Sequence, residues 1–286
     1  MSNKEIIENA RYLLINPRYR DVQHLQKASD IDAKNGLYAI TQPHLTQPPH
    51  WALRLIDLQQ RSDVREKMFQ WVSDSKLPRD IFCGWWVTDA DPGRVKMHIE
   101  QQMVQYTPDG RRMLLRYFDP RVLDQLVHIL DDAQRYALMG PISQWGILDA
   151  DRRIQCIERP SFTRGKISIR KEQWDAIART EEVDRIRRCW QRLLDGHPLP
   201  DDHYYKIVSW LVIADEYQLD DMTDRTSFVL LGIDKGWRFD HTDIFRHLLH
   251  QHRMTSVTLT ELFKQMTPDQ WQYLDQWANK ETAVYA

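Results

Sequence analysis

The chain has 286 residues, which is enough for one large domain or two small ones. A chain of this length can form a hydrophobic core that is stable without disulfide bonds or a structural metal. Lys and Arg total 39 and Asp and Glu total 41, and the resulting net charge of −2 lacks the basic excess of a nucleic-acid-binding protein. The three cysteines form no CxxC pair, which argues against a zinc ribbon or a disulfide framework and is typical of a reducing cytoplasm.

The N-terminal stretch and the longest apolar runs bear on localisation. Residues 1–14 lack the apolar core of a signal peptide. No apolar run approaches the roughly 20 residues that a membrane-spanning helix needs. We therefore expect a cytoplasmic protein that binds neither nucleic acid nor a membrane.

Helical and strand patterns alternate in the first half of the chain. Residues 5–15 favour a short helix, and residues 21–50 are polar and rich in turn formers. Ser62 is a candidate cap for a helix that runs to Val72. This mixture predicts an α+β or α/β N-terminal lobe with a mixed sheet. The other predicted elements are strands at 51–58, 81–87 and 98–106, a helix or turn at 94–97, and a hairpin that joins 144–148 to 153–157.

The second half, from Lys171 onward, has helical spacing of apolar residues throughout. A long or broken helix is predicted up to Leu194, and the segment 196–200 ends it. We therefore expect an all-α C-terminal lobe and place the two domains at residues 1–165 and 166–286. Another helix is predicted at residues 204–217, and further helix starts are predicted at Thr242 and at the capping boxes Thr258–Glu261 and Thr267–Gln270.

The most informative stretch lies between residues 107 and 145 and begins with a hairpin turn. Pro108 presets φ for the first central position of the turn, and the side chain of Asp109 can bond its own backbone. Gly110 accepts a positive φ without steric cost. Residues 113–118 then predict a strand that is apolar on one face and nearly so on the other, where Arg116 is the exception.

A helix is predicted after this strand. Asp119 is a good N-cap and Pro120 a good first helical residue. Apolar residues at 123, 126, 127 and 130 share one helical face. The helix is expected to end at Gly140 and Pro141.

The order of these motifs resembles the core signature of bacterial type VI secretion effector adaptors, also called effector chaperones or Tap/TEC proteins. The resemblance covers about residues 35–160, and Trp51-Ala52-Leu53 and the 98–106 strand fit the family layout more loosely. The polar, proline-bearing stretch at 42–50 departs from the family pattern. The matching residues, called the signature below, are Pro108, Asp109, Gly110, Arg116, Tyr117, Phe118, Asp119, Pro120, Arg121, Gly140, Pro141 and Trp145.

The resemblance implies a non-enzymatic cytoplasmic protein without a cofactor. Adaptors of this family bind a cognate toxic effector, keep it soluble, and help to load it onto the VgrG spike or its PAAR tip. The charged signature residues Arg116, Asp119 and Arg121 would then either contact a partner or form a structural ion pair and helix cap. We favour the structural interpretation, because Asp followed by Pro at a helix start already explains Asp119.

Two other functional classes remain open. The DDxxD pattern of Asp220, Asp221 and Asp224 fits a metal- or diphosphate-dependent enzyme, because carboxylates at this spacing can bridge hard cations. His247 and His250 are three residues apart and could share a metal on one helix face. A regulatory interaction protein unrelated to secretion is the third possibility. The sequence contains neither a GxSxG elbow nor a phosphate-binding glycine motif.

Overall fold

The computed structural model describes residues 3–16, 36–41, 52–74, 81–149, 153–161, 165–195, 197–236 and 238–284. Within the chain, two compact units divide after Thr180, and each is described by itself. The first combines an antiparallel sheet with helices and the second is helical in its described part, which confirms the predicted fold class. The domain limits 1–165 and 166–286 stay a prediction.

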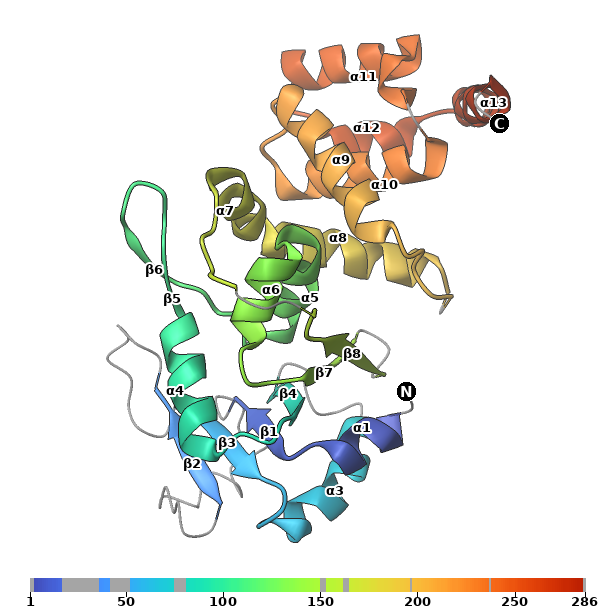
Figure 1. Cartoon of the computed structure of the whole chain (residues 1–286). Coiled ribbons are helices and arrows are strands. Elements are labelled where there is room, and N and C mark those ends of the chain that lie inside the picture. Colours follow the sequence, from blue (N-terminus) through green and yellow to red (C-terminus); the bar gives the residue numbers. More distant parts are fainter. Residues whose placement is uncertain are drawn as a thin grey trace. The chain divides into compact units, whose positions relative to one another are not determined.

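The main sheet of the first unit contains six strands within the described residues, and every neighbouring pair is antiparallel. Strand β1 lies at the centre of this arrangement, between β3 and β4 (Figure 1). The order across the sheet is β2 (Leu37–Ile40), β3 (Leu53–Asp57), β1 (Tyr12–Ile15), β4 (Phe82–Val87), β7 (Gln144–Leu148) and β8 (Ile154–Glu158).

Both faces of the sheet are buried. Leu13 and Ile15 of β1 pack in a core with helices α1 (Asn3–Asn9) and α3 (Ser62–Ser73). Tyr12 and Leu14 point to the other face, since successive strand residues alternate. That second core is covered by α4 (Pro92–Gln102), α5 (Pro120–Ile129) and α6 (Asp132–Met139).

Two further elements complete the first unit. Strands β5 (Val104–Tyr106) and β6 (Arg112–Leu114) form a separate two-stranded hairpin beyond the end of α4 (Figure 1). Helix α7 (Lys171–Ala178) packs on α5. A buried amide pair helps to hold α7 in place, because Gln173 and Gln134 of α6 exchange side-chain hydrogen bonds of 2.8 and 3.0 Å.

The second unit packs its helices around aromatic side chains. Phe228 contacts the rings of Trp210, Phe239 and Phe245 at centroid distances of 5.3 to 5.7 Å. Its elements are α8 (Thr180–Leu193, which begins at the dividing residue), α9 (His203–Glu216), α10 (Met222–Lys235), the 3-10 helix η5 (Phe239–His241), α11 (Asp243–Met254), α12 (Leu259–Gln265) and α13 (Pro268–Val284).

Many predicted elements are confirmed, including the hairpin of β7 with β8, the buried strand β4, the helix α3 and the caps at Thr242 and Thr258. The helix predicted at residues 5–15 is wrong in its second half, which forms β1. Its four residues are all buried, and a short apolar run buried on both faces lacks the alternation that marks a strand. Strand β2 lies within the stretch predicted as polar and turn-rich.

The strand predicted at 98–106 is wrong for residues 98–102, which belong to helix α4. The side chain of Asp91 accepts a hydrogen bond from the backbone N of Arg94 (2.9 Å), and Pro92 occupies the first turn. Val95 and Ile99, four residues apart, are the buried residues of this helix. The helical spacing therefore continues through the segment in which a strand was expected.

Two boundaries near the signature also differ from the prediction. Strand β6 ends at Leu114, because Tyr117 and Phe118 are both buried in the same core and do not alternate. The single helix expected after Pro120 is two helices, α5 and α6. Asp131 starts the second helix through a capping box with Gln134, a pattern present in the sequence.

Candidate functional site

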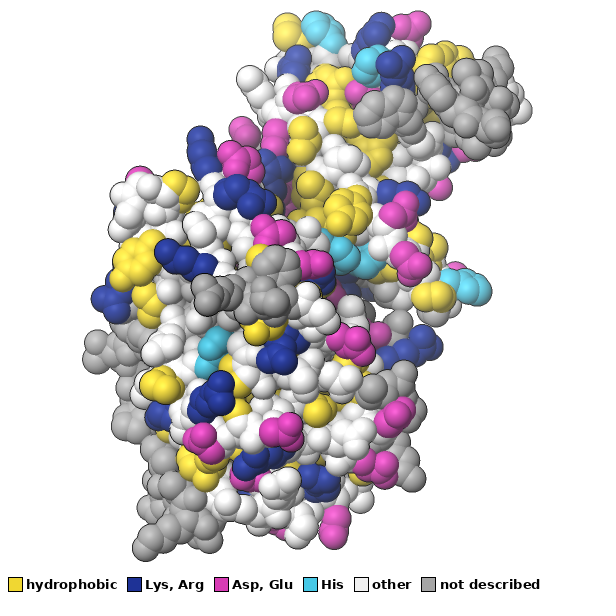
Figure 2. Space-filling model, viewed as in Figure 1, with side chains coloured by type: hydrophobic (Ala, Val, Ile, Leu, Met, Phe, Trp, Pro, Cys, Tyr) yellow, Lys and Arg dark blue, Asp and Glu magenta, His cyan; other side chains and the backbone are white. Residues whose placement is uncertain are grey.

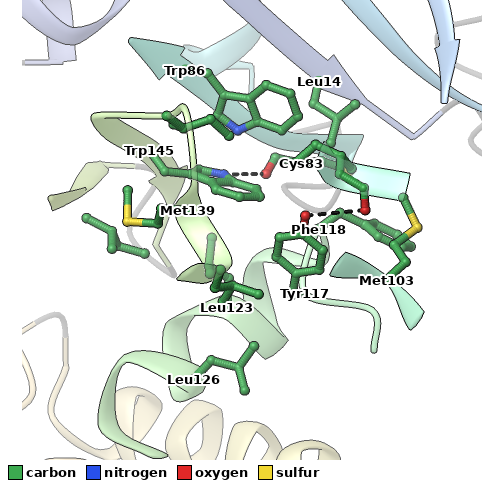
Figure 3. Close-up of a cluster of buried hydrophobic side chains, with 14 of the residues drawn as sticks. Leu14, Cys83, Trp86, Met103, Tyr117, Phe118, Leu123, Leu126, Met139 and Trp145 are labelled. Atoms are coloured by element: carbon green, nitrogen blue, oxygen red, sulfur yellow. Dashed lines mark hydrogen bonds between the residues drawn. The ribbon is translucent and has the colours of Figure 1, made fainter. Parts of the chain in front are cut away.

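Trp145 forms the buried centre of the signature (Figure 3). Its indole Nε1 donates a hydrogen bond of 3.0 Å to the carbonyl O of Cys83, and its ring contacts Trp86 and Tyr117 edge-on. A Cβ atom on Gly84 would lie only 2.0 Å from this Nε1, so β4 needs glycine at that position. Trp145 and Tyr117 are therefore part of the scaffold between β4, β7 and α5.

The charged signature residues cluster at the start of α5. Asp119 accepts hydrogen bonds from the backbone N (3.1 Å) and the Nε (2.9 Å) of Arg121, and its Oδ2 lies 2.7 Å from Nη2 of the same residue. Arg116 Nη2 is 3.6 Å from the carboxylate. The side chain of Asp119 is 7% exposed, whereas those of Arg116 and Arg121 are 45% and 40% exposed. One buried carboxylate thus caps the helix and anchors two half-exposed cations.

The hairpin tip of the signature is exposed to solvent. Gly110 adopts a φ of +81° and donates its backbone N–H to Thr107 O at 2.8 Å. Asp109 accepts a hydrogen bond from the Thr107 hydroxyl, which is the main reason that the pKa of this carboxyl lies below its usual range. Pro108, Asp109 and Gly110 are all exposed, and a Cβ on Gly110 would meet nothing within 4 Å.

The turn at Gly140 and Pro141 is packed against α4. Gly140 has a φ of +52°, and a Cβ there would lie 2.2 Å from Cε1 of His98. His98 donates from Nε2 to the carbonyl O of Leu138 (2.9 Å), and burial lowers the pKa of its imidazole below the usual range. Arg159 donates to the carbonyl O of Gly140, which ties β8 to the same turn.

A groove of about 720 Å³ opens beside this turn. We call it the α4–α6 groove, because α4 and β5 form one side and the end of α6 forms the other, together with Arg159 and residues 165–167. The wall at 165–167 is fixed against α6: Gln134 Nε2 donates to Ser168 O at 2.7 Å, and a Cβ on Gly165 would lie 2.2 Å from the carbonyl O of Ala133. Gly140 and Pro141 of the signature belong to its lining.

The α4–α6 groove combines positive charge with apolar surface. Its described lining contains the cations Arg94, Arg159 and Lys166 and no Asp or Glu. Met97 and Tyr106 line it with 55% and 60% of their surface exposed. Figure 2 shows Lys and Arg side chains near a histidine on this face of the first unit, with hydrophobic side chains over the β5–β6 hairpin. These groove residues come from separate parts of the sequence, and no local motif connects them.

Two aspartates of the DDxxD pattern, Asp221 and Asp224, accept hydrogen bonds from the starts of helices. Asp221 accepts hydrogen bonds from the backbone N of Thr223 (2.8 Å) and of Asp224 (2.9 Å) at the start of α10. Asp224 is 1% exposed and accepts from the backbone N of Leu259 and of Thr260 and from the Thr260 hydroxyl at 2.7 to 3.0 Å. Both oxygens of Asp224 therefore hold the start of α12, which is not the arrangement of a metal ligand.

Within the described residues, the histidine pair has no further side chains that would complete a metal site. His247 and His250 are exposed on α11. In the described part of the chain, no three His, Cys, Asp or Glu side chains are grouped so that they could hold a metal ion. A second groove of about 720 Å³ lies within the helical unit and is mainly apolar, with Trp190, Leu193 and Trp271 in its lining.

Comparison with known proteins gives a family match for part of the chain. Residues 11–137 match the family model described as Domain of unknown function (DUF4123). The matched region extends from β1 into α6 and contains the signature residues from Pro108 to Arg121, whereas Gly140, Pro141 and Trp145 follow it. No curated protein and no solved structure matches the chain.

Among the described helices, none combines the length and the apolar character needed to cross a membrane.

Proposed function

We propose that this protein is a cytoplasmic, non-enzymatic adaptor of the type VI secretion system that binds a toxic effector and helps to load it onto the VgrG spike or its PAAR tip. The observation that carries the proposal is that the matched region, residues 11–137, contains most of the signature by which the sequence resembles these adaptors. The remaining signature residues, Gly140, Pro141 and Trp145, pack directly onto elements of the matched region.

The α4–α6 groove is the surface that suits this role best. Met97 and Tyr106 offer exposed apolar area, and aromatic residues with a polar tip are favoured at protein interfaces. An adaptor that covers an apolar patch of its effector removes an aggregation liability. The signature supports the groove from beneath, because the turn at Gly140 fixes α6 against His98 of α4.

The direct test is to express the tagged protein in its native host and to identify co-purifying proteins by mass spectrometry. We expect one toxin, with or without a spike protein. The strain must express its secretion genes, and a strain that carries only the tag controls for background. Recovery of no specific protein under these conditions would contradict the proposal.

A variant refines the same experiment. Tyr106→Ala should reduce recovery of the toxin, since an exposed aromatic anchor is lost while the core stays intact. Tyr205→Ala is the matched control, because Tyr205 is 59% exposed on α9 of the helical unit. Equal loss from both variants would argue against the α4–α6 groove as the effector site.

A further inference from the structure

Strand β5 is paired on one side by β6. The antiparallel register places Gln105 opposite Met113 and Tyr106 opposite Arg112. Just beyond the strands, the backbone N of Thr107 donates to the carbonyl O of Arg111 at 2.9 Å. Hydrogen-bonded and non-hydrogen-bonded pairs alternate along an antiparallel ladder. Gln105 and Met113 therefore exchange the backbone hydrogen bonds of the hairpin.

The same alternation turns the backbone groups of Val104 and Tyr106 toward the opposite edge. At the other end of the hairpin, Leu115 N donates a hydrogen bond to Met103 O (2.8 Å). Met103, like Gln105 two residues later, therefore bonds across the hairpin, and Val104 between them does not. Outside the β5–β6 pair, the described part of the chain forms no hydrogen bond to the backbone of Val104 or Tyr106. Two N–H donors and two C=O acceptors are thus presented in a row.

This open edge faces the α4–α6 groove. All three β5 residues belong to the groove lining, whereas no residue of β6 does. Residues 165–167 line the same groove and are held by Gln134 and by the close approach of Gly165 to Ala133. An extended segment that enters the groove can therefore bind β5 as an added strand, a common mode of peptide recognition.

The charge of the groove selects the chemistry of that segment. Arg94 and Lys166 are exposed, and within the described residues no ion pair involves Arg94, Arg159 or Lys166. A positive lining without carboxylates attracts acidic partners and repels basic ones. The Arg159 guanidinium is held over the ring of Tyr136 at 5.3 Å and donates to Gly140 O, so its position is preorganised.

We propose that the α4–α6 groove binds an extended acidic segment of the effector, which adds as a strand to the open edge of β5 and places its carboxylates beside Arg94, Arg159 and Lys166. This inference rests on the proposed function and names the part of the effector that is recognised. A peptide is favoured over a nucleic acid because only a peptide backbone can satisfy the N–H and C=O groups of Val104 and Tyr106 in register.

The test uses the full-length protein and a fluorescein-labelled peptide of alternating glutamate and valine, followed by fluorescence anisotropy. A lysine–valine peptide of equal length controls for charge. A glutamate–valine peptide with alternate backbone nitrogens methylated controls for strand addition, because it lacks the donors that face β5. We expect each control peptide to bind at least about tenfold more weakly, because the methylated peptide loses its hydrogen bonds to β5 and the lysine peptide is repelled by the cations of the groove.

Charge reversal in the protein locates the site. Lys166→Glu and Arg94→Glu should each weaken binding of the glutamate–valine peptide about fivefold, with a smaller effect at high salt. Lys264→Glu makes the same change at an exposed position of α12 and should leave the affinity unchanged. Thermal unfolding of each variant confirms that the fold is retained.

Four results would overturn the inference. They are no binding of the glutamate–valine peptide up to millimolar concentration, equal binding of the lysine peptide, equal binding of the methylated peptide, and displacement of the peptide by single-stranded DNA. A different result, the absence of a co-purified toxin, would contradict the proposed function. If a toxin is recovered but the peptide tests fail, the adaptor binds its effector elsewhere.

Discussion

The signature contains two glycine turns whose surroundings differ. Gly110, at the tip of the β5–β6 hairpin, has a positive φ and open space around it. Gly140, at the end of α6, has a positive φ and lies against the imidazole of His98. The first turn requires only a backbone conformation, whereas the second also requires the absence of a side chain. Glycines in one signature can therefore be needed for different physical reasons.

The residues around the two turns differ in the same way. In the buried part of the signature that includes Gly140, the side chains of Trp145 and Tyr117 are fully buried and in contact, and Trp145 donates a hydrogen bond to Cys83 of β4. Around Gly110, Pro108 and Asp109 are exposed, and their contacts are local. The buried part of the signature supports the groove, whereas the exposed hairpin tip should tolerate substitution without loss of the fold. Single-residue variants test this contrast.

Gly84→Ala should destabilise the protein most. The new Cβ would overlap the indole of Trp145, and the backbone at Gly84 has a φ of +153°. Overpacking and backbone strain together should cost about 4 kcal/mol in the free energy of unfolding. Urea denaturation followed by tryptophan fluorescence measures the change. A stability equal to that of the wild type would mean that β4 and β7 do not pack as described.

Gly140→Ala and Gly110→Ala compare the two turns directly. The first should lower the free energy of unfolding by about 2 to 3 kcal/mol, because strain is combined with a clash against His98. The second should cost only about 1 kcal/mol, the strain of a left-handed residue in open space. Thermal and urea unfolding of the pair give the difference. A lower stability of Gly110→Ala than of Gly140→Ala would contradict the contrast between the two turns.

Asp119→Ala should reduce stability by about 1 kcal/mol through loss of the cap of α5. The ion pairs of Asp119 with Arg116 and Arg121 contribute little to the free energy of unfolding, because both arginines are half exposed and screened by solvent. Asp109→Ala at the hairpin tip is the matched control, and a smaller loss of stability is expected because its hydrogen bonds with Thr107 and Arg111 lie between exposed groups. Folded Asp119→Ala protein should still bind its effector. A variant that melts like the wild type yet loses binding would show that Asp119 contacts the partner.

His98 should make stability depend on pH. Burial, reinforced by repulsion from Arg94, lowers the pKa of His98 in the folded protein. The unfolded chain therefore takes up a proton first, and stability decreases as the pH falls below about 6.5, the ordinary histidine value. His98→Gln, which keeps a donor for Leu138 O, should flatten the profile in this window. Urea unfolding at pH 7 and pH 5 measures the effect, and an equal decrease in both proteins would contradict it.

Local chemistry made part of the fold predictable. The turn at Pro108 to Gly110 and the caps at Asp119 and Thr242 follow from the preferences of single residues, and the structure contains all three. The errors arose where tertiary packing decides. Strand β1 ends a segment, residues 5–15, whose apolar spacing favoured a helix, but the strand is buried on both faces. Helix α4 continues through a segment in which a strand was expected.

The candidate site was less predictable than the fold. The residues of the α4–α6 groove come from α4, β5, α6 and the segments around Arg159 and Lys166, so their proximity depends on the packing of distant parts of the first unit. Asp224 illustrates the reverse case. Its motif suggested a metal ligand, but the start of α12, about 35 residues later, uses both of its oxygens. A short motif does not reveal which distant donors will reach it.

Hydrogen–deuterium exchange of the protein, alone and bound to its co-purified effector, tests the central claim most directly. The backbone amides of Val104 and Tyr106 face the α4–α6 groove and have no partner in the described part of the free chain. If the effector adds a strand to β5, these two amides should exchange more slowly in the complex. Unchanged exchange at both residues, with protection elsewhere, would contradict the account.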